Sequence, residues 1–161
     1  NFGDKFKDKT IVEIGASQGQ SSRLLSHIFK DVYSVEIDDW NLEQARKNTE
    51  DKDNVHLIKM DLYNDTWSDF LPKDVDVVFI DAGHEYHQVT SDIENSLKLF
   101  GDPIFIFDDY GLPPGDVKRA IEDKLLSGDL RSIRFIGEKP EDLVSASNTK
   151  FFEMEGCICN E

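Results

Sequence analysis

The sequence is poor in cysteine and in basic residues. The first shortage argues against a fold held by disulfides, and the second argues against partners that are polyanions. Its two cysteines, Cys157 and Cys159, stand one residue apart and so cannot staple a fold by bridging each other. We therefore expect reduced thiols and a cytoplasmic location, with a Cys-x-Cys metal half-site as the alternative. The chain carries 18 Lys and Arg against 33 Asp and Glu, for a net charge of −15. Because phosphates bind to clustered positive charge, this balance argues against nucleic acid and against an anionic membrane surface.

Long apolar runs are also missing. No stretch of 18 apolar residues and no signal-peptide pattern occurs, which argues against a membrane partner. A chain of 161 residues with 39% hydrophobic residues can still bury a core, and we expect a single domain over 1–161. Because the chain begins with Asn rather than Met, we expect a piece excised from, or adjacent to, a larger protein.

Short β-rich runs alternate with amphipathic stretches, which predicts an α/β fold with a doubly wound, mainly parallel, seven-stranded sheet. The last two strands follow without a helix between them, which predicts an antiparallel C-terminal hairpin. The expected strands are Thr10–Ile14, Val32–Glu36, Val55–Met60, Val75–Asp81, Ile104–Asp108, Ser132–Gly137 and Lys150–Glu155. The expected helices are Ser22–Phe29, Trp40–Thr49, a short turn at Thr66–Leu71, His87–Phe100 and Asp116–Leu126.

The first expected strand ends in an acid, Glu13, and a turn with Gly15 and Gly19. Glycine permits a positive φ and a close approach of a ligand to the backbone. The next stretch opens with Ser21 and Ser22 and continues as an amphipathic helix. A strand, a glycine turn and a helix start together indicate the front of a nucleotide-type site. A tight turn that binds no ligand is the alternative.

Acidic residues also end the second and third expected strands. Glu36 lies roughly 20 residues beyond the glycine turn, where a carboxylate can accept hydrogen bonds from both ribose hydroxyls. Asp61 follows the third strand directly. In so acidic a chain, a solvated acid at the end of a strand is the alternative reading of Glu36.

The spacing Glu-x-Gly-x-x-x-Gly, with Ala16 and Ser17 inside it, resembles the first motif of the class I S-adenosylmethionine-dependent methyltransferases rather than the G-x-G-x-x-G of dinucleotide sites. The resemblance implies a Rossmann-like fold and S-adenosylmethionine as cofactor, with Glu36 on the ribose and Asp61 on the adenine amino group. The cofactor-binding residues that it implies are Glu13, Gly15, Ala16, Ser17, Gly19, Ser21, Glu36, Ile37, Met60, Asp61, Leu62 and Asp81.

Three further acids stand at the tips of neighbouring strands. Asp81 follows the fourth strand, and Asp108 and Asp109 follow the fifth. Carboxylates that lie close repel one another unless they hold protons or a cation. Oxygen ligands predict a hard divalent ion, Mg²⁺ first, with Mn²⁺ or Ca²⁺ as alternatives. In the opposing interpretation, Asp109 caps a turn and Asp108 is solvated.

The pattern Asp-x-x-His-x-Tyr from Asp81, followed later by Phe-Asp-Asp-Tyr, is similar to metal-dependent sugar O-methyltransferases. The resemblance implies that Asp81, Asp108 and Asp109 hold Mg²⁺, with Asp81 also catalytic. Many relatives have a second acid where this chain has Gly83, which leaves the catalytic base open. His84 is the natural replacement, because a neutral imidazole can take a hydroxyl proton near pH 7. A His that only bonds a loop carbonyl or a metal-bound water is the alternative.

These patterns predict an O-methyltransferase that acts, with metal assistance, on a hydroxyl of a small molecule or glycan, with a sugar as the expected acceptor. A glycosyltransferase, fused to the domain or working with it, is the expected partner. Three alternatives stay open: a methyltransferase for catechols or other small diols, an NAD-type oxidoreductase, and a scaffold that has kept the fold without catalysis.

Overall fold

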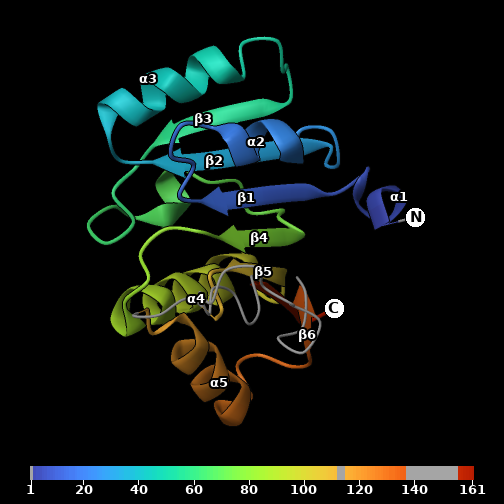
Figure 1. The fold of residues 1–161 in the computed structure, drawn as a ribbon, viewed down its shortest axis with the longest axis vertical. Helices are drawn as coiled ribbons and strands as arrows, with labels where there is room; N and C mark the ends of the chain where they lie inside the picture. The colour runs from blue at the N-terminus through green and yellow to red at the C-terminus, as the bar shows by residue number, and fades with distance from the viewer. Residues whose placement is uncertain (1, 112–114, 137–155) are drawn as a thin grey trace, which may run out of the picture.

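The computed structural model describes residues 2–111, 115–136 and 156–161, which form one sheet with helices packed on it (Figure 1). The seven strands are β1 (Thr10–Ile14), β2 (Asp31–Glu36), β3 (Val55–Lys59), β4 (Val77–Ile80), β5 (Ile104–Asp108), β6 (Ile133–Ile136) and β7 (Gly156–Cys159). They lie in the order β3-β2-β1-β4-β5-β7-β6. Strands β1 to β5 pair in parallel, and β7 is antiparallel to both β5 and β6. The predicted fold class is confirmed.

The predicted last strand, Lys150–Glu155, lies outside the described residues. The strand that the structure describes there is Gly156–Cys159, which lies between β5 and β6. Its Gly-Cys-Ile-Cys sequence lacks the β-branched alternation that marks strands, so periodicity could not find it. Gly156 begins the strand where a Cβ atom would overlap the carbonyl oxygen of Phe107 on β5. Cys157 and Cys159 are free thiols, and both are buried on the same side of β7.

The helices agree with the predicted ones to within a few residues. The first predicted helix is shorter than expected and ends at Leu25, because the chain then turns and buries Phe29 against the sheet. The helix Phe2–Phe6 was not predicted; Phe6 at its end packs against Phe29, with 5.4 Å between the centroids of the two tilted rings. The helices are α1 (Phe2–Phe6), α2 (Gln20–Leu25), α3 (Asp39–Asn48), the 3₁₀ turn η1 (Trp67–Asp69), α4 (Tyr86–Phe100) and α5 (Val117–Ser127).

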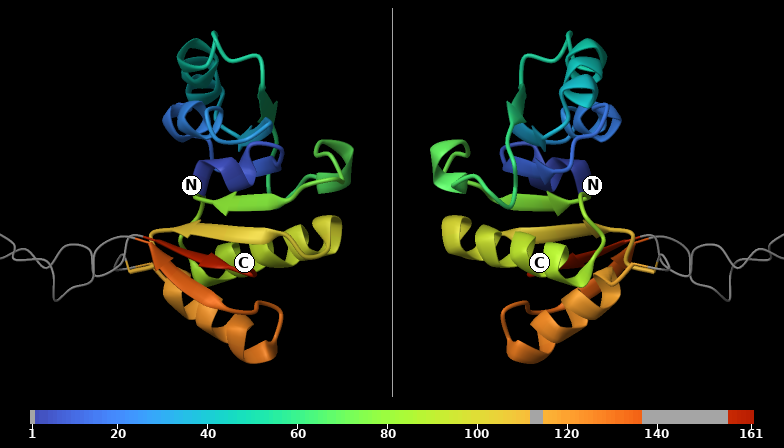
Figure 2. Two further views of the ribbon diagram at one scale, coloured as in Figure 1. Left: turned by 90° about the vertical axis from the view of Figure 1, so that its right-hand side faces the viewer. Right: turned by 90° about the vertical axis from the view of Figure 1, so that its left-hand side faces the viewer.

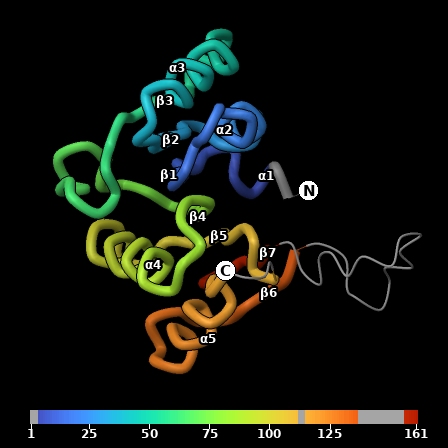
Figure 3. Tube along the Cα trace, turned by 60° about the vertical axis from the view of Figure 1, so that its left-hand side comes forward, coloured from blue at the N-terminus to red at the C-terminus, as the bar shows by residue number. Residues whose placement is uncertain are grey.

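Helices cover both faces of the sheet. The tube view places α1 and α2 on one side of the strands and α4 on the other (Figure 3). The side views place α2 and α3 beside the β1–β3 half and α4 and α5 beside the half formed by β4 to β6 (Figure 2). Each face therefore has its own buried cluster, one with residues of α4 and α5 and a smaller one around Phe6 and Phe29. No helix in the described part of the chain is both long and apolar enough to cross a bilayer.

Candidate active site

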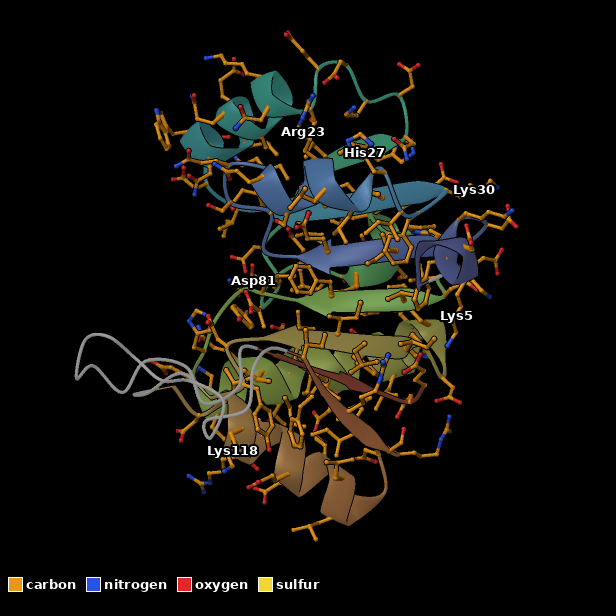
Figure 4. The ribbon with its side chains drawn as sticks, turned by 45° about the vertical axis from the view of Figure 1, so that its right-hand side comes forward. Lys5, Arg23, His27, Lys30, Asp81 and Lys118 are labelled. Atoms are coloured by element: carbon orange, nitrogen blue, oxygen red, sulfur yellow. The ribbon has the colours of Figure 1, made fainter. Side chains whose placement is uncertain are left out.

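A cavity of about 310 Å³ opens at the carboxyl ends of β1, β2, β3 and β4. The sheet order reverses between β1 and β4, and open α/β sheets bind ligands at this kind of switch point. Asp81 lies at this edge, and Lys5 and Lys30 lie at the opposite one (Figure 4). The residues that line the cavity are Gly15, Ser17, Val35, Glu36, Ile37, Met60, Asp61, Leu62, Tyr63, Asp81, Ala82, Gly83 and Gln88.

The two glycines of the first turn have different roles. Gly15 lines the cavity with φ +98°, and a Cβ atom there would overlap the carbonyl oxygen of Asp81. Gly19 is buried away from the cavity lining, and its Cβ would lie 2.9 Å from the Cα of Ala45 on α3. Gly19 has the expected positive φ, +79°, and its lack of a side chain allows α2 to pack against α3.

Glu13, which the resemblance places among the cofactor-binding residues, does not line the cavity. It is fully buried beneath α2, where its Oε2 accepts a 2.5 Å hydrogen bond from Ser22. Burial raises the pKa of this carboxyl, and the hydroxyls of Ser21 and Ser22 oppose that shift. Glu13, Ala16 and Ser21 are absent from the cavity lining, because Glu13 and Ala16 point into the protein and Ser21 belongs to α2.

The acids at the ends of β2 and β3 do line the cavity, and both hold nearby backbone groups. The Oε1 of Glu36 accepts hydrogen bonds from the amides of Ile37 and Asp38, each at 2.8 Å. The Oδ1 of Asp61 accepts from the amides of Tyr63 and Asn64, at 3.0 and 3.2 Å. Asn64 also donates to Asp61 Oδ2 at 2.7 Å, and this bond, followed by the Tyr63 amide, lowers the pKa of Asp61.

Sequence reasoning missed five residues of the lining. Val35, Tyr63 and Ala82 are direct neighbours of predicted residues, so extending each motif by one position would have found them. Gly83 and Gln88 could be found only from the start of α4, because that helix turns Gln88 back over Gly83.

A second cluster lies at the end of the cavity that Asp81 lines. Asp81, His84 and Asp109 each offer a ligand atom, and these atoms lie within 4.8 Å of one another. His84 Nε2 is 2.8 Å from Asp109 Oδ2, and Asp109 has a φ of +56°. Asp108 is not in this group; its Oδ1 accepts the Asp109 amide at 3.0 Å. The structure thus combines two of the three predicted metal ligands with the predicted base.

Electrostatics at this cluster suit a cation. Burial first, then the negative charges of Asp108, Asp109 and Glu13, raises the pKa of Asp81 to about 7. A bound cation would relieve that repulsion. The two carboxylates suit Mg²⁺ or Mn²⁺. The residues present therefore fit a divalent ion.

Comparison with known proteins gives a family and a fold. The family model described as a methyltransferase domain matches residues 12–110. The sequence has no match among curated proteins.

Solved structures match the fold. Fibrillarin from Aeropyrum pernix, solved with S-adenosyl-L-methionine, has 18% identity and a TM-score of 0.69 over 97% of this chain and 67% of its own. Precorrin-6y C5,15-methyltransferase from Geobacter metallireducens has 18% identity and a TM-score of 0.68 over 97% and 82%. An rRNA methylase from Streptococcus thermophilus has 15% identity and a TM-score of 0.64 over 98% and 89%.

Proposed function

Because the chain belongs to a family of methyltransferase domains, we propose that it transfers a methyl group from S-adenosylmethionine to a hydroxyl of a sugar or glycan, assisted by a divalent metal ion. One observation carries the choice of a hydroxyl acceptor: the group of Asp81, His84 and Asp109 adjoins the cavity through Asp81. Methylation of a weakly acidic hydroxyl is helped by a base that removes its proton and by a cation that lowers its pKa, and both can lie here beside a cofactor cavity.

The cavity supports S-adenosylmethionine as the cofactor. Its volume of about 310 Å³ is within the range of small-molecule sites. The Oε2 of Glu36 accepts no hydrogen bond from the described residues and suits a ribose diol, and Asp61, which also lines the cavity, can accept from an amino group. The bound cofactor would supply an electrophilic methyl group. The fibrillarin with the same fold was solved with this molecule.

The metal site would consist of Asp81 and Asp109, with His84 beside it. A divalent ion held there would lower the pKa of the acceptor hydroxyl. His84 Nε2 faces Asp109, so Nδ1 is the ring nitrogen that remains to accept the hydroxyl proton. Asp109 then orients the imidazole, as a carboxylate orients a catalytic histidine in other enzymes.

The choice of a sugar rests on charge as well as on the resemblance of the motifs. A net charge of −15 disfavours RNA, although an rRNA methylase shares the fold. A vicinal diol, as in a sugar or a catechol, can offer two neighbouring oxygens to one cation. An acceptor screen must therefore contain catechols beside sugars.

Calorimetry with S-adenosylmethionine tests the proposal first, in Mn²⁺, in Mg²⁺ and in chelator. At a ligand concentration about 100 times Kd, stabilisation should reach roughly 2.7 kcal/mol. The melting temperature should then rise by roughly 2–4 °C per kcal/mol. Methylated sugar that forms with metal and disappears with chelator would support the assignment. Tight cofactor binding with metal-independent turnover would overturn the metal role, and absence of binding would overturn the function.

A further inference from the structure

Gln88 reaches the cavity from α4, and no motif accounts for it. It is the third residue of the helix, is half-buried, and lines the cavity together with Asp61 and Leu62. Its Oε1 accepts the backbone amide of Glu85 at 3.2 Å, as part of a capping box at the start of α4. Within the described residues, its Nε2 donates to no protein atom. The carboxamide is therefore held by its oxygen and offers its nitrogen.

Gly83 explains how Gln88 comes to lie there. A Cβ atom at Gly83 would overlap both Cδ and Oε1 of Gln88. Any side chain at position 83 would therefore displace the carboxamide from the cavity wall. Many relatives carry an acid at position 83, whereas in this chain Gly83 leaves room for the carboxamide of Gln88, a hydrogen-bond donor.

We infer that Gln88 recognises the adenine of the cofactor by donating from Nε2 to ring nitrogen N7; this inference rests on the proposed function. The amino group of adenine is a donor, with acceptor nitrogens N1 and N7 on either side. Asp61 accepts only, so it suits the amino group. The backbone amide of Leu62, which bonds no protein atom in the described part of the chain, suits N1. The Nε2 of Gln88 is a further donor on the lining of this cavity, and N7 is the acceptor that the Leu62 amide leaves.

A variant separates this role from helix capping. Gln88→Glu keeps an acceptor for the Glu85 amide and puts a negative charge at a helix start, where it is favourable. It also replaces the donor with an acceptor that would repel the N7 lone pair. Gln88→Ala removes both the donor and the cap, and serves as the comparison for stability.

Calorimetry should use S-adenosylhomocysteine and its 7-deaza analogue, in which a C–H replaces N7. We expect the wild type to bind the 7-deaza analogue about 5- to 10-fold more weakly, the worth of one hydrogen bond. Gln88→Glu should lose about 10-fold for S-adenosylhomocysteine, keep its melting temperature, and bind the 7-deaza analogue as well or better. The order of preference is thus reversed in the variant.

Two results would count against the idea in different ways. If wild type and Gln88→Glu share the same preference between the two ligands, Gln88 is only a helix cap and the inference fails. If wild type binds neither ligand, the proposed function fails instead. A drop in the melting temperature of Gln88→Ala alone would report the cap and leave the preference of Gln88→Glu to decide.

Discussion

The edge of the sheet at which the cavity opens has two halves, one at β2 and β3 and one at β4 and β5. Both halves carry carboxylates, but their electrostatic states are opposite. At the tips of β2 and β3, Glu36 and Asp61 accept hydrogen bonds from their own loops. At the tips of β4 and β5, Asp81 and Asp109 lie near each other, and the pKa of Asp81 rises to about 7. The carboxylates of the first half are held by hydrogen bonds from their own loops, whereas the repulsion in the second half is relieved only by a proton or a cation. A preformed half suits the part of a ligand that does not react, and a strained half suits the part where a proton moves or a cation binds.

Disrupting the close contact between Gly15 and the Asp81 carbonyl, where the two halves meet, should have the largest effect on stability. In Gly15→Ala, a Cβ would overlap the Asp81 carbonyl at a φ of +98°. We expect a loss of about 3 kcal/mol of unfolding free energy, from overpacking and backbone strain together. Gly128→Ala is the matched control, because Gly128 has φ +84° with nothing within 4 Å, and should lose only about 1 kcal/mol. Urea unfolding measures both, and equal losses would show that the contact with Asp81 is unimportant.

Removing charge from the strained half should stop turnover and spare the preformed half. Asp109→Asn keeps the shape and a residue that tolerates the positive φ, but it loses the carboxylate that faces His84. We expect turnover to fall about 100-fold or more. Cofactor affinity by calorimetry should stay within about twofold, because Asp109 is outside the cavity lining. Asp108→Asn should cost less; the reverse ranking would favour the ligand set implied by the sequence.

Asp92 lies outside both halves, but like Asp81 it is a carboxyl with a raised pKa, so its effect on stability should depend on pH. Asp92 on α4 is fully buried, and neither of its oxygens has a partner in the described residues. Burial raises its pKa to about 7. The folded state therefore holds this proton more tightly than the unfolded chain, so the wild type loses stability as pH rises from about 4 to 7.

Asp92→Asn should remove that slope. A shift of about three pKa units corresponds to about 4 kcal/mol, so we expect the variant to gain about 2–4 kcal/mol relative to wild type between pH 4 and pH 8. Denaturant midpoints at the two pH values measure this difference. A constant difference between variant and wild type would mean that Asp92 stays charged throughout.

The smallest effect is expected from the preformed half. Asp61→Asn keeps an oxygen for the amides of Tyr63 and Asn64, so its loop should persist. We expect cofactor affinity to fall only about fivefold, since one acceptor of the adenine amino group weakens. Calorimetry measures this loss. A collapse of the melting temperature would show that the charge itself holds the loop.

Local patterns predicted most of the fold. Strand β1 and the glycine turn are adjacent in sequence, so a short apolar run followed by Gly15 sufficed to place one wall of the cavity. The register of β7 depends on β5, which is about fifty residues away, and on the glycine contact with Phe107, so no local pattern could predict it.

The site was predictable to the extent that its residues sit at strand ends. Asp81 and Asp61 follow strands, and both line the cavity. Glu13 shows the limit: its position in the motif is the expected one, but alternation along β1 turns it under α2. The pairing of His84 with Asp109 depends on a positive φ at Asp109, which the sequence does not signal in a non-glycine residue.

The position of β7 in the sheet also determines when the sheet can be completed during synthesis. Among the described residues, β6 joins the sheet only through β7, and β7 lies between β5 and β6. A ribosome that has translated up to β6 has therefore produced a β5 edge with unpaired backbone groups and a β6 without a partner. Until residues 156–159 leave the exit tunnel, that edge is open to pairing with other chains. Pairing between strands so far apart in the sequence is slow, so the interval before β7 emerges is the stage at which the chain is most exposed to aggregation.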